Sequence, residues 1–313
     1  MQIFRHLEGL PEECRYGVVT LGNFDGVHRG HKAVLGRTLK AARMREAPLV
    51  VVTFEPHPMS VFQPNIAPFR LTPFCTKAGH LADLAVDVLV TLQFDLEFAR
   101  VSASDFVRRV LVDGLAASHI IIGYDFAFGY KRQGNAALLK QLSKTHGFTV
   151  DVAKPVRESG SEIYSSSLIR KYLCAGDPRR AAQLLGRPWE MGGTVIPGSK
   201  LGRDLGFPTA NIELGEYLRP KTGIYAVRAG IDAGEATHWL PGAANIGTRP
   251  TVDGTGLLLE VHVLDFSGDL YGQVMRVEIM DYLRPEEKFD SLDEMRAQIS
   301  MDCDRARQIL SVN

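Results

Sequence analysis

The sequence predicts two domains of different fold, an N-terminal α/β domain on a mostly parallel sheet and a small C-terminal antiparallel β-barrel with a terminal helix. Apolar runs of strand length alternate with helical patterns in the first half, whereas strand patterns separated by Gly and Pro follow one another in the second. The 313 residues suffice for two domains that each bury a core. Because the pattern changes near residue 186, we predict domains at residues 1–186 and 187–313.

The first half is predicted to form a doubly wound, Rossmann-like sheet. β-Branched runs that predict strands lie at 17–21, 49–54, 87–92, 119–123 and 148–152. The helical patterns between them cover 32–45, 73–85, 105–115 and 136–146. Helix-end signals support this alternation, because Ser102 to Asp105 forms a capping-box pattern and Gly147 stands at a C′ position. In such a sheet, ligands bind beyond the carboxyl ends of the strands.

The turn after the first of these strands is predicted to bind a phosphate. Glycines between residues 22 and 30 allow positive φ angles and a close approach of the backbone to a ligand, and the following helix offers unpaired N–H groups. His28 and His31 share one face of the first helical turn if the helix begins near Val27. The residues expected to bind nucleotide here are Gly22, Phe24, Asp25, His28, Gly30 and His31.

Two plainer interpretations of this turn stay open. The glycines can serve a tight connection in which Asp25 bonds its own backbone, and the H-x-x-H spacing also occurs in metal sites. Nearby carboxylate and thiolate ligands are too few to favour a metal. Two imidazoles in a phosphate cradle can instead donate hydrogen bonds to non-bridging oxygens and stabilise the charge that develops on phosphorus. Nucleotidyl transfer requires this stabilisation.

Two further segments, residues 54–58 and 123–129, are predicted to line the same site because they also follow strands. Phe62, Phe126 and Phe128 could offer a flat apolar wall to an aromatic ligand. Aromatic side chains near strand ends equally serve ordinary packing, so both interpretations stay open.

A second anion-binding arrangement is predicted at the start of another helix. Ser165 and Ser166 supply hydroxyl and N–H groups there, and Arg170 adds a guanidinium group one turn further on. A serine N-cap beside a surface arginine is the alternative. Two anion-binding arrangements in one domain together favour a triphosphate ligand.

The second half is predicted to form the barrel from the spacing of its strands. Strand candidates lie at 192–196, 210–214, 223–229, 238–246, 257–265 and 273–282. A final helix begins at the capping-box pattern from Ser291 to Glu294. Its apolar stripe, which we expect to pack on the barrel, consists of Met295, Ile299, Cys303, Ala306 and Leu310.

The stretch from Gly202 to Asn211 is predicted to carry the chemistry of the second half. Gly202 and Gly206 give the backbone freedom, and the oxygens of Thr209 and Asn211 would project from one face of a strand toward a nucleotide-bound Mg²⁺. An ordinary hydrogen bond at a turn or sheet edge is the alternative for this pair. Glu260 lies in an apolar strand and either faces solvent or acts as a general base. Periodicity does not decide between these roles.

Charge and composition restrict the partners. Lys plus Arg and Asp plus Glu number 36 each, so no basic excess favours nucleic acid or an anionic membrane surface. The apolar runs are too short to span a bilayer, and the 4 cysteines are scattered without a C-x-x-C pattern. We expect a cytoplasmic protein that acts on small molecules, without nucleic-acid or membrane partners and with at most weak self-association.

The motifs carry a resemblance over nearly the whole chain. The stretch from Gly22 to His31 resembles the nucleotidyltransferase signature G-x-F-D-G-x-H-x-G-H, and Ser165 to Arg170 resembles the second motif of that superfamily, S-S-[ST]-x-x-R. The stretch from Gly202 to Asn211 matches G-R-x-L-G-F-P-T-A-N, which is much more specific to riboflavin kinases. Further matches are Ile246 to Thr251, Glu260 to His262 and Asp269 to Gly272. The chain therefore resembles the bacterial bifunctional riboflavin kinase/FMN adenylyltransferases, also called FAD synthetases.

The resemblance implies that the N-terminal domain adenylylates FMN with ATP and releases FAD and pyrophosphate. His28, His31, Ser166 and Arg170 would hold the ATP phosphates and stabilise the transition state, while the FMN phosphate attacks the α-phosphorus directly. No covalent enzyme intermediate is needed.

The resemblance also implies that the C-terminal domain phosphorylates riboflavin to FMN with ATP. Thr209 and Asn211 would position Mg-ATP, with Mg²⁺ as cofactor and ATP as co-substrate, and Glu260 would accept the proton of the attacking ribityl hydroxyl. The residues implied to contact the flavin in the two domains are Phe62, Asp125, Phe126, Phe128 and Arg284.

Four residues depart from the family pattern. Tyr164 replaces a small aliphatic residue, Ser167 a threonine, and Leu168 and Ala127 basic residues. Two other classes of protein stay open. One is a single-activity adenylyltransferase whose barrel recognises another acceptor, against which the second-half motifs argue. The other is a flavin carrier without turnover.

Overall fold

The computed structural model describes residues 1–157, 162–198, 201–233, 236–251 and 254–311. The chain folds into two compact units. Unit 1 comprises Met1–Ile66 and Phe74–Tyr164, and unit 2 comprises Ala67–Pro73 and Ser165–Asn313. This division groups residues 165–186 with the barrel, whereas we predict a domain boundary after residue 186. The boundary between functional halves stays a prediction.

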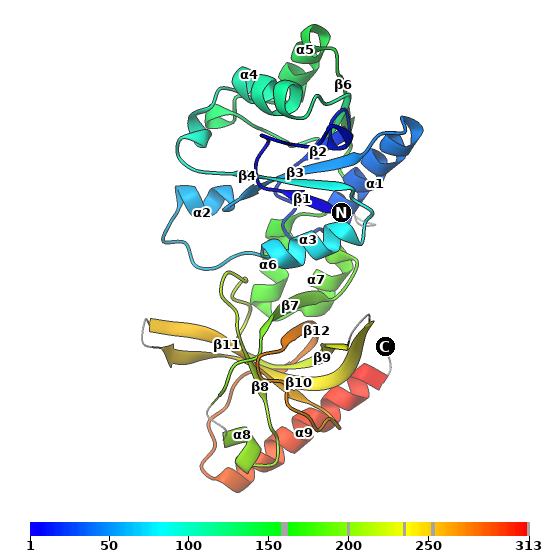
Figure 1. Cartoon of the computed structure of the whole chain (residues 1–313). Helices are drawn as coiled ribbons and strands as arrows, with labels where there is room; N and C mark the ends of the chain where they lie inside the picture. The colour runs from blue at the N-terminus through cyan, green and yellow to red at the C-terminus, as the bar shows by residue number, and fades with distance from the viewer. Residues whose placement is uncertain (158–161, 199–200, 234–235, 252–253, 312–313) are drawn as a thin grey trace. The chain divides into compact units, whose positions relative to one another are not determined.

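Unit 1 contains the predicted sheet of strands that alternate with helices along the chain (Figure 1). Its strands are β1 (Gln2–Phe4), β2 (Val18–Leu21), β3 (Leu49–Glu55), β4 (Val88–Gln93), β5 (His119–Gly123) and β6 (Thr149–Ala153). Among the described residues they pair in the order β1-β4-β3-β2-β5-β6, and all of these pairings are parallel. The predicted parallel sheet is confirmed, with β1 added at its edge.

The helices of unit 1 include all four predicted ones, but α2 is additional and one predicted helix is partly of another type. They are α1 (Arg29–Met44), α2 (Pro58–Phe62), α3 (Phe74–Ala82), α4 (Ala103–Phe106) and α5 (Ala136–His146), with short 3-10 helices η1 (Glu12–Cys14), η2 (Phe98–Arg100) and η4 (Tyr130–Arg132). The helix predicted over 105–115 is α4 continued as a π-helix, η3 (Val107–Gly114). Ser102 caps α4, because its Oγ accepts a hydrogen bond from the Asp105 N–H at 3.0 Å.

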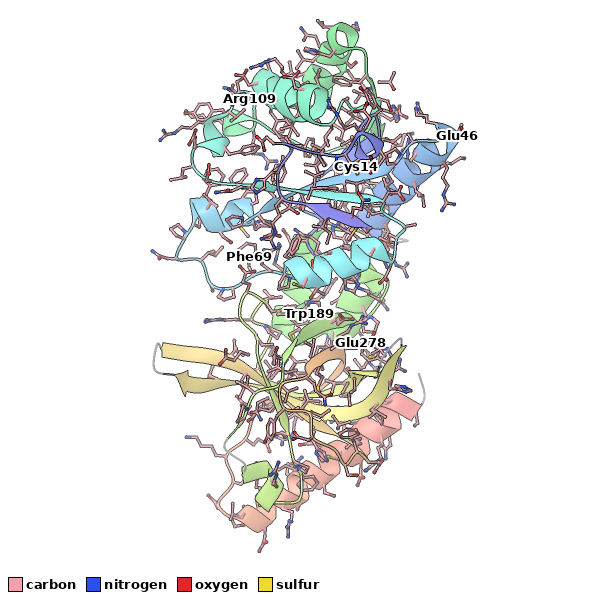
Figure 2. The ribbon with its side chains drawn as sticks, viewed as in Figure 1. Cys14, Glu46, Phe69, Arg109, Trp189 and Glu278 are labelled. Carbon is pink, nitrogen blue, oxygen red and sulfur yellow. The ribbon has the colours of Figure 1, made fainter. Side chains whose placement is uncertain are left out.

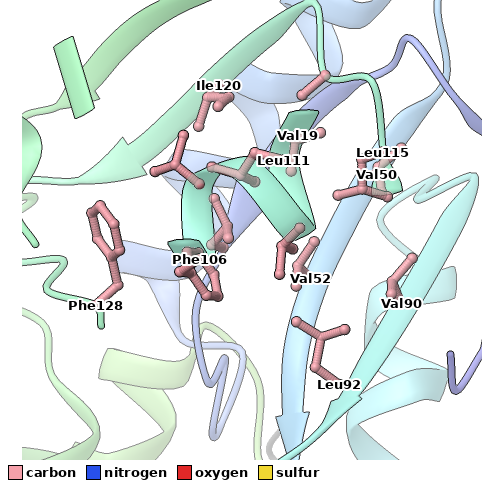
Figure 3. Packing of buried hydrophobic residues seen from close by; sticks show 14 of the residues in the cluster. Val19, Val50, Val52, Val90, Leu92, Phe106, Leu111, Leu115, Ile120 and Phe128 are labelled. Atoms are coloured by element: carbon pink, nitrogen blue, oxygen red, sulfur yellow. The ribbon is translucent and has the colours of Figure 1, made fainter. Parts of the chain in front are cut away.

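Both faces of this sheet are covered, as expected of a doubly wound fold. Alternate strand residues face opposite sides. Val50 packs in a cluster with Phe106 on the side of α4 and η3 (Figure 3), and Val51 packs in another cluster with Leu35 of α1. The near-continuous apolar strands follow from this burial on both faces.

Strand β2 lies where the strand order changes direction. β3 and β4 extend the sheet on one side of β2, and β5 and β6 extend it on the other. The carboxyl end of β2 is therefore the topological switch point, the place where such sheets bind ligands. The turn from β2 into α1 is the predicted phosphate cradle.

Unit 2 is built on an antiparallel sheet that nearly closes into a barrel. Its elements are α6 (Ser166–Ala175), α7 (Pro178–Leu185), β7 (Trp189–Thr194), α8 (Leu201–Asp204), β8 (Ala210–Glu213), β9 (Gly223–Ala233), β10 (Ala236–Thr251), β11 (Gly254–Val263), β12 (Val274–Arg284) and α9 (Leu292–Ser311). The described strands pair in the order β7-β12-β9-β10-β11-β8. Beyond β7, the Ile196 N–H donates to the Asn211 main-chain oxygen of β8 at 2.8 Å, which brings the two edges together. The predicted small barrel is confirmed.

Helix α9 packs on the barrel through the predicted apolar stripe. Cys303 and Ala306 are buried in a cluster with Leu283 of β12. The predicted N-terminal cap is present, because the Glu294 N–H donates to Ser291 Oγ at 3.2 Å. Burial raises the pKa of the Cys303 thiol to about 11, so this thiol is protonated and unreactive at neutral pH.

Among the described residues, no helix has both the length and the apolar character that crossing a bilayer requires.

Candidate functional site

The turn between β2 and α1 carries backbone strain. Phe24, Gly26 and Val27 have φ angles of 48°, 87° and 41°. A positive φ is uncommon for Phe and an outlier for a β-branched residue, so the surrounding structure must hold these residues in place. Phe24 and Val27 are both buried, which provides that constraint. Strain of this kind concentrates at ligand-binding turns.

The two histidines lie together at the start of α1. His28 is the N-cap of this helix, and its Nδ1 accepts a hydrogen bond from the His31 N–H at 3.3 Å. The proton of a neutral His28 ring is therefore on Nε2. The two rings are stacked with their centroids 3.7 Å apart. The helix begins at Arg29, between Val27 and the start of the predicted helical pattern at residue 32, and the pairing of the two imidazoles is as expected.

Close packing around the turn explains its glycines. A Cβ added to Gly30 would lie 3.0 Å from the His28 ring and 3.4 Å from the Tyr164 main-chain oxygen. A Cβ added to Gly22 would lie 3.3 Å from the Phe24 ring. One compact turn thus gathers all the residues predicted for this cradle, which are Gly22, Phe24, Asp25, His28, Gly30 and His31.

The electrostatics of the turn keep His31 neutral. Burial lowers the pKa of His31 well below its usual range, and the neighbouring His28 and Lys77 lower it further. Its Nδ1 is buried and has no hydrogen-bond partner among the described residues. An unpaired buried nitrogen costs free energy until a ligand satisfies it.

Lys77 of α3 is a residue of this site that the sequence analysis missed. The residue is 0% exposed, and its Nζ lies 2.8 Å from Glu55 Oε1, 3.1 Å from Thr53 Oγ1 and 3.3 Å from the Asn23 main-chain oxygen. The only signal in the sequence was a lysine on the apolar face of a predicted helix. That pattern alone does not identify its partners.

The predicted aromatic wall consists of rings that contact one another. Phe62 meets Phe94 edge to face at a centroid distance of 5.7 Å, and Phe126 stacks on Phe128 at 5.6 Å. Phe62 is 59% exposed, whereas Phe128 is buried in the core of unit 1. Asp125 is exposed in the same loop. Packing is thus the role of Phe128 in this structure, and ligand contact by any of these residues stays a prediction.

The second predicted anion site lies at the start of α6 in unit 2. Ser165 caps this helix through its Oγ, which accepts a hydrogen bond from the Leu168 N–H at 3.3 Å, and Ser166 is the first helical residue. Arg170 Nε donates to the main-chain oxygen of Phe69 at 2.8 Å, and the guanidinium lies over the Phe69 ring, which Figure 2 labels. The N-cap alternative is therefore also realised. These residues belong to unit 2, whereas the histidine pair belongs to unit 1.

Thr209 and Asn211 border one pocket of unit 2. The lining residues are Gly198, Arg203, Pro208, Thr209, Asn211 and Tyr271. Asn211 is 2% exposed, its Nδ2 donates to the Thr209 main-chain oxygen at 3.2 Å, and its Oδ1 is buried without a partner among the described residues. The two predicted glycines precede this pair along the chain. Gly202 lies in α8, and Gly206 has a φ angle of 90°.

Strand register sets Glu260 beside Asn211. Glu260 of β11 pairs directly with Asn211 of β8. The neighbours Leu259 and Val261 are 0% and 1% exposed, so they point into the barrel core and Glu260 projects from the opposite face. Among the described residues, the structure thus brings together three predicted residues of the second half, Thr209, Asn211 and Glu260.

Asn245 of β10 is a second residue that the sequence analysis missed. It pairs with Glu260 on the side opposite to Asn211. Its Nδ2 donates to Glu286 Oε1 at 3.2 Å, and its Oδ1 is buried and unpaired within the described part of the chain. Glu260 is therefore flanked on both sides by asparagines with unsatisfied acceptor oxygens. We call Asn211, Glu260 and Asn245 the acceptor row.

Arg284 is held within unit 2. Its Nε and Nη2 donate to the two Asp302 carboxylate oxygens at 3.0 and 2.8 Å, and Nη1 donates to the Pro285 main-chain oxygen at 2.9 Å. Asp302 lies on α9 and is 5% exposed. The guanidinium thus anchors the end of β12 to α9. Its predicted proximity to the flavin stays a prediction.

Known proteins resemble this chain over its whole length. A family model described as FAD synthetase matches residues 10–167, and one described as riboflavin kinase matches residues 185–310. The bifunctional riboflavin kinase/FMN adenylyltransferase of Pseudomonas fluorescens is 44% identical over 310 residues, covering 99% of this chain and 98% of the relative. The protein with the same description from Escherichia coli K12 is 40% identical over 313 residues, covering 100% and 99%.

A solved structure has the same fold throughout. It is described as a macrolide-efflux protein from Streptococcus pneumoniae, with a TM-score of 0.85 and 30% identity over 97% of this chain and 98% of that chain. Efflux is a statement about that protein, and the likeness to this chain is one of fold.

Fold and family matches together define a nucleotide-dependent transferase with two activities. The chain belongs to the bifunctional riboflavin kinase/FMN adenylyltransferase family. It is an enzyme that phosphorylates riboflavin to FMN with ATP and adenylylates FMN to FAD with a second ATP. The resemblance predicted from the motifs is confirmed, and the riboflavin kinase match of the second half excludes the single-activity alternative.

Proposed function

We propose that the turn between β2 and α1 holds ATP for the adenylylation of FMN, and that the acceptor row of unit 2 carries the phosphorylation of riboflavin. One observation supports this assignment more than any other. The turn brings two imidazole rings and the first N–H groups of a helix together, as an anion requires, whereas the row collects acceptor oxygens, as a hydroxyl proton or a metal ion requires.

In the adenylylation site, the histidines donate hydrogen bonds to the ATP phosphates. The Nε2–H of His28, one N–H of His31 and the first N–H groups of α1 would donate to the phosphate oxygens on which negative charge accumulates. A phosphate oxygen of FMN attacks the α-phosphorus, the bond to the β-phosphate breaks, and pyrophosphate leaves. The hydrogen bonds from these groups strengthen as negative charge develops on the phosphate oxygens in the transition state.

The remaining ATP contacts of this site are assigned by motif. Ser165, Ser166 and Arg170 hold phosphate oxygens through hydroxyl, N–H and guanidinium groups. Gly22, Phe24, Asp25 and Gly30 shape the turn that receives the nucleotide.

In the kinase site, Glu260 is the general base. Its carboxylate takes the proton of the terminal ribityl hydroxyl of riboflavin as that oxygen attacks the γ-phosphorus of ATP. The bond between the γ-phosphorus and the bridging oxygen breaks, and ADP leaves. The residues assigned to this ATP are Gly202, Gly206, Thr209 and Asn211.

The residues around Asn211 fit Mg²⁺ as the cofactor. Mg²⁺ prefers oxygen ligands and usually retains water and substrate phosphates in its shell. The buried, unpaired Oδ1 of Asn211 is such a ligand, and Thr209 borders the same pocket. The hydrogen bond from Asn211 Nδ2 to the Thr209 main-chain oxygen orients this oxygen. When bound, the ion would neutralise charge on the phosphates.

The flavin contacts and the cellular location are also proposals. Phe62, Asp125, Phe126 and Phe128 contact FMN in unit 1, and Arg284 lies near the flavin in unit 2. The cysteines are free thiols, including the exposed Cys75 and Cys174, which suits the reducing cytoplasm. The halves 1–186 and 187–313 contain, respectively, the motifs of the adenylyltransferase and of the kinase.

Replacing Glu260 separates the two activities. In the full chain, Glu260→Ala should reduce FMN formation from riboflavin and Mg-ATP by about 10²- to 10⁴-fold, because the proton acceptor is lost. FAD formation from supplied FMN should not change. Chromatography of the products measures both rates, and Glu213→Ala on β8, an exposed carboxylate, is the matched control. Equal loss of both activities in the folded variant would refute the assignment.

Replacing His31 gives the reciprocal result. His31→Ala should reduce FAD formation from FMN by about 10²- to 10³-fold, since one donor to the developing charge is removed, and should leave FMN formation intact. His6→Ala, at an exposed histidine of the same unit, is the control. An unchanged FAD yield would count against the cradle.

A further inference from the structure

Lys77 connects three segments beneath the turn between β2 and α1. Its Nζ contacts the Asn23 main-chain oxygen in the turn itself, and Thr53 Oγ1 and Glu55 Oε1 on β3. The side chain of Lys77 is 1% exposed, whereas that of Glu55 retains 19% exposure. The lysine is therefore the more deeply buried member of an ion pair between α3 and β3.

A buried ion pair is a weak source of stability. Removing two charges from water costs several kcal/mol per ion, so well-packed apolar residues are often as stable or more stable at such positions. Stability alone therefore does not explain why a charged ammonium group is buried at this position. Its location supplies an explanation, because Asn23 immediately precedes Phe24 in the strained part of the turn.

We propose that Lys77 is a positioning residue for adenylylation, which holds the strained turn through Asn23 and supplies a fixed positive charge beneath the ATP phosphates. This inference rests on the proposed role of the turn. The hydrogen bond to the Asn23 main-chain oxygen holds the backbone directly before Phe24, and so it holds the start of the strained segment. Glu55 in turn fixes the ammonium group, so the charge stays in place before ATP arrives.

The effect of Lys77 on His31 supports this inference. Burial is the main cause that lowers the pKa of His31, and His28 and Lys77 add to it. The charged or titratable groups around this position are His28 and Asp25 in the turn, Lys77 on α3 and Glu55 on β3. The positive charge of Lys77 thus favours the neutral form of His31, which can then act as a hydrogen-bond donor.

The experiment compares Lys77→Met, Lys77→Arg and the double variant Glu55→Gln/Lys77→Met in the full chain. Lys77→Met should reduce kcat/KM for FAD formation on the order of 10²-fold, as expected when a turn that aligns the reacting groups shifts. Lys77→Arg should recover part of the loss, because it retains a charge and donors. Riboflavin phosphorylation in the same protein is the internal control, and Lys40→Met, at an exposed lysine of α1, is the matched control.

The double variant distinguishes positioning from mere ion pairing. It removes both charges and leaves neither unpaired, so it remains the decisive variant if Lys77→Met alone does not fold. We expect the double variant to stay impaired in FAD formation. The His31 pKa, followed by ¹⁵N NMR of the ring, should rise in it. Restored FAD formation with an unshifted His31 pKa would overturn the proposal, as would a Lys77→Met variant with normal FAD formation.

These results are separable from the proposed function. If His31→Ala impairs adenylylation but the Lys77 variants do not, only the present inference is wrong. If His31→Ala has no effect, the assignment of the turn itself is wrong.

Discussion

The turn between β2 and α1 and the acceptor row of the barrel are built in opposite ways. The turn is formed mainly by the main chain, because strained φ angles and a capped helix N-terminus bring N–H groups and imidazoles close together. In the row, side chains on three neighbouring strands, β8, β11 and β10, are brought together by register alone. The first site offers donors and the second offers acceptors.

The difference agrees with the ligand that we propose for each site. A phosphate has only acceptor oxygens at its surface, and backbone N–H groups at a helix start are the most rigid donors that a protein has. A hydroxyl proton and a metal ion need acceptors, which Glu and Asn side chains supply from any strand face. The unsatisfied atoms agree with this contrast, because an imidazole nitrogen of His31 is unpaired in the turn and amide oxygens of Asn211 and Asn245 are unpaired in the row, each within the described part of the chain.

The largest effect that would sharpen this comparison concerns Asn211. Asn211→Leu removes the unpaired buried acceptor and keeps the size of the side chain. Loss of a contact to a charged ligand, worth about 1.5–3 kcal/mol, should lower kcat/KM for riboflavin phosphorylation about 10- to 100-fold. FAD formation from FMN should be unaffected. Steady-state kinetics at several Mg²⁺ concentrations provides the measurement.

The same substitution should destabilise the barrel only slightly. It removes the unpaired Oδ1, but it also removes the hydrogen bond from Nδ2 to the Thr209 main-chain oxygen, which contributes about 0.5–1.5 kcal/mol. Urea unfolding of the variant tests this expectation. A variant that loses kinase activity and stability together would indicate that Asn211 has a structural role, and normal kinase activity would remove it from the site.

Much of the fold could be predicted because its signals are local. The apolar run at 119–123 and the helical pattern at 136–146 coincide with β5 and α5, and the barrel strands all appear where turn residues separate them. Among the features of unit 1 that were not predicted, β1 and the helix type of η3 have a physical explanation. β1 is only three residues long, and η3 has a π-helical period that an apolar stripe does not distinguish from an α-helix.

The candidate sites could be predicted only where a motif is contiguous. The residues from Gly22 to His31 lie in one turn, so sequence adjacency implies spatial adjacency. Lys77 and Asn245 meet their partners through helix packing and strand register, which a single sequence does not specify. The grouping of residues 165–186 with the barrel also depends on tertiary packing, so the sequence alone does not predict it.

A smaller effect tests the electrostatics of the turn. The pKa of His31 in the folded chain is well below 6.5, mainly because of burial, and burial also lowers the pKa of His119. The unfolded chain therefore binds more protons than the folded chain at acidic pH. The free energy of unfolding of unit 1 should fall as the pH drops below about 6.5, by up to about 1.4 kcal/mol for each unit of pKa difference.

A His31→Gln variant should have a shallower pH dependence than the wild type. The urea midpoint of the unit 1 transition, measured at pH 7.5 and pH 5.5, gives the comparison, with His6→Gln as the control at an exposed position. If both variants lose as much stability on acidification as the wild type, His31 is not the group responsible.

The smallest predicted effect compares backbone strain outside the candidate sites with backbone strain in the turn. Glu46, which follows the C-cap of α1 and is labelled in Figure 2, has a φ angle of 50° and is exposed. Glycine is the favoured residue at such a left-handed position. Glu46→Gly relieves about 1–2 kcal/mol of backbone strain, and the greater freedom of glycine in the unfolded chain offsets about 0.4–1 kcal/mol of this gain. The free energy of unfolding should therefore rise by roughly 0.5 kcal/mol.

Both activities of Glu46→Gly should equal those of the wild type, because this end of α1 is distant from the turn along the helix. Phe24→Gly, by contrast, would relieve the strain in the turn before α1 and remove a buried ring. FAD formation should therefore fall while FMN formation persists. Urea unfolding and the two activity assays on both variants test the contrast. Loss of FAD formation in Glu46→Gly would show that backbone strain at either end of α1 affects adenylylation. The effect would then not be specific to the turn.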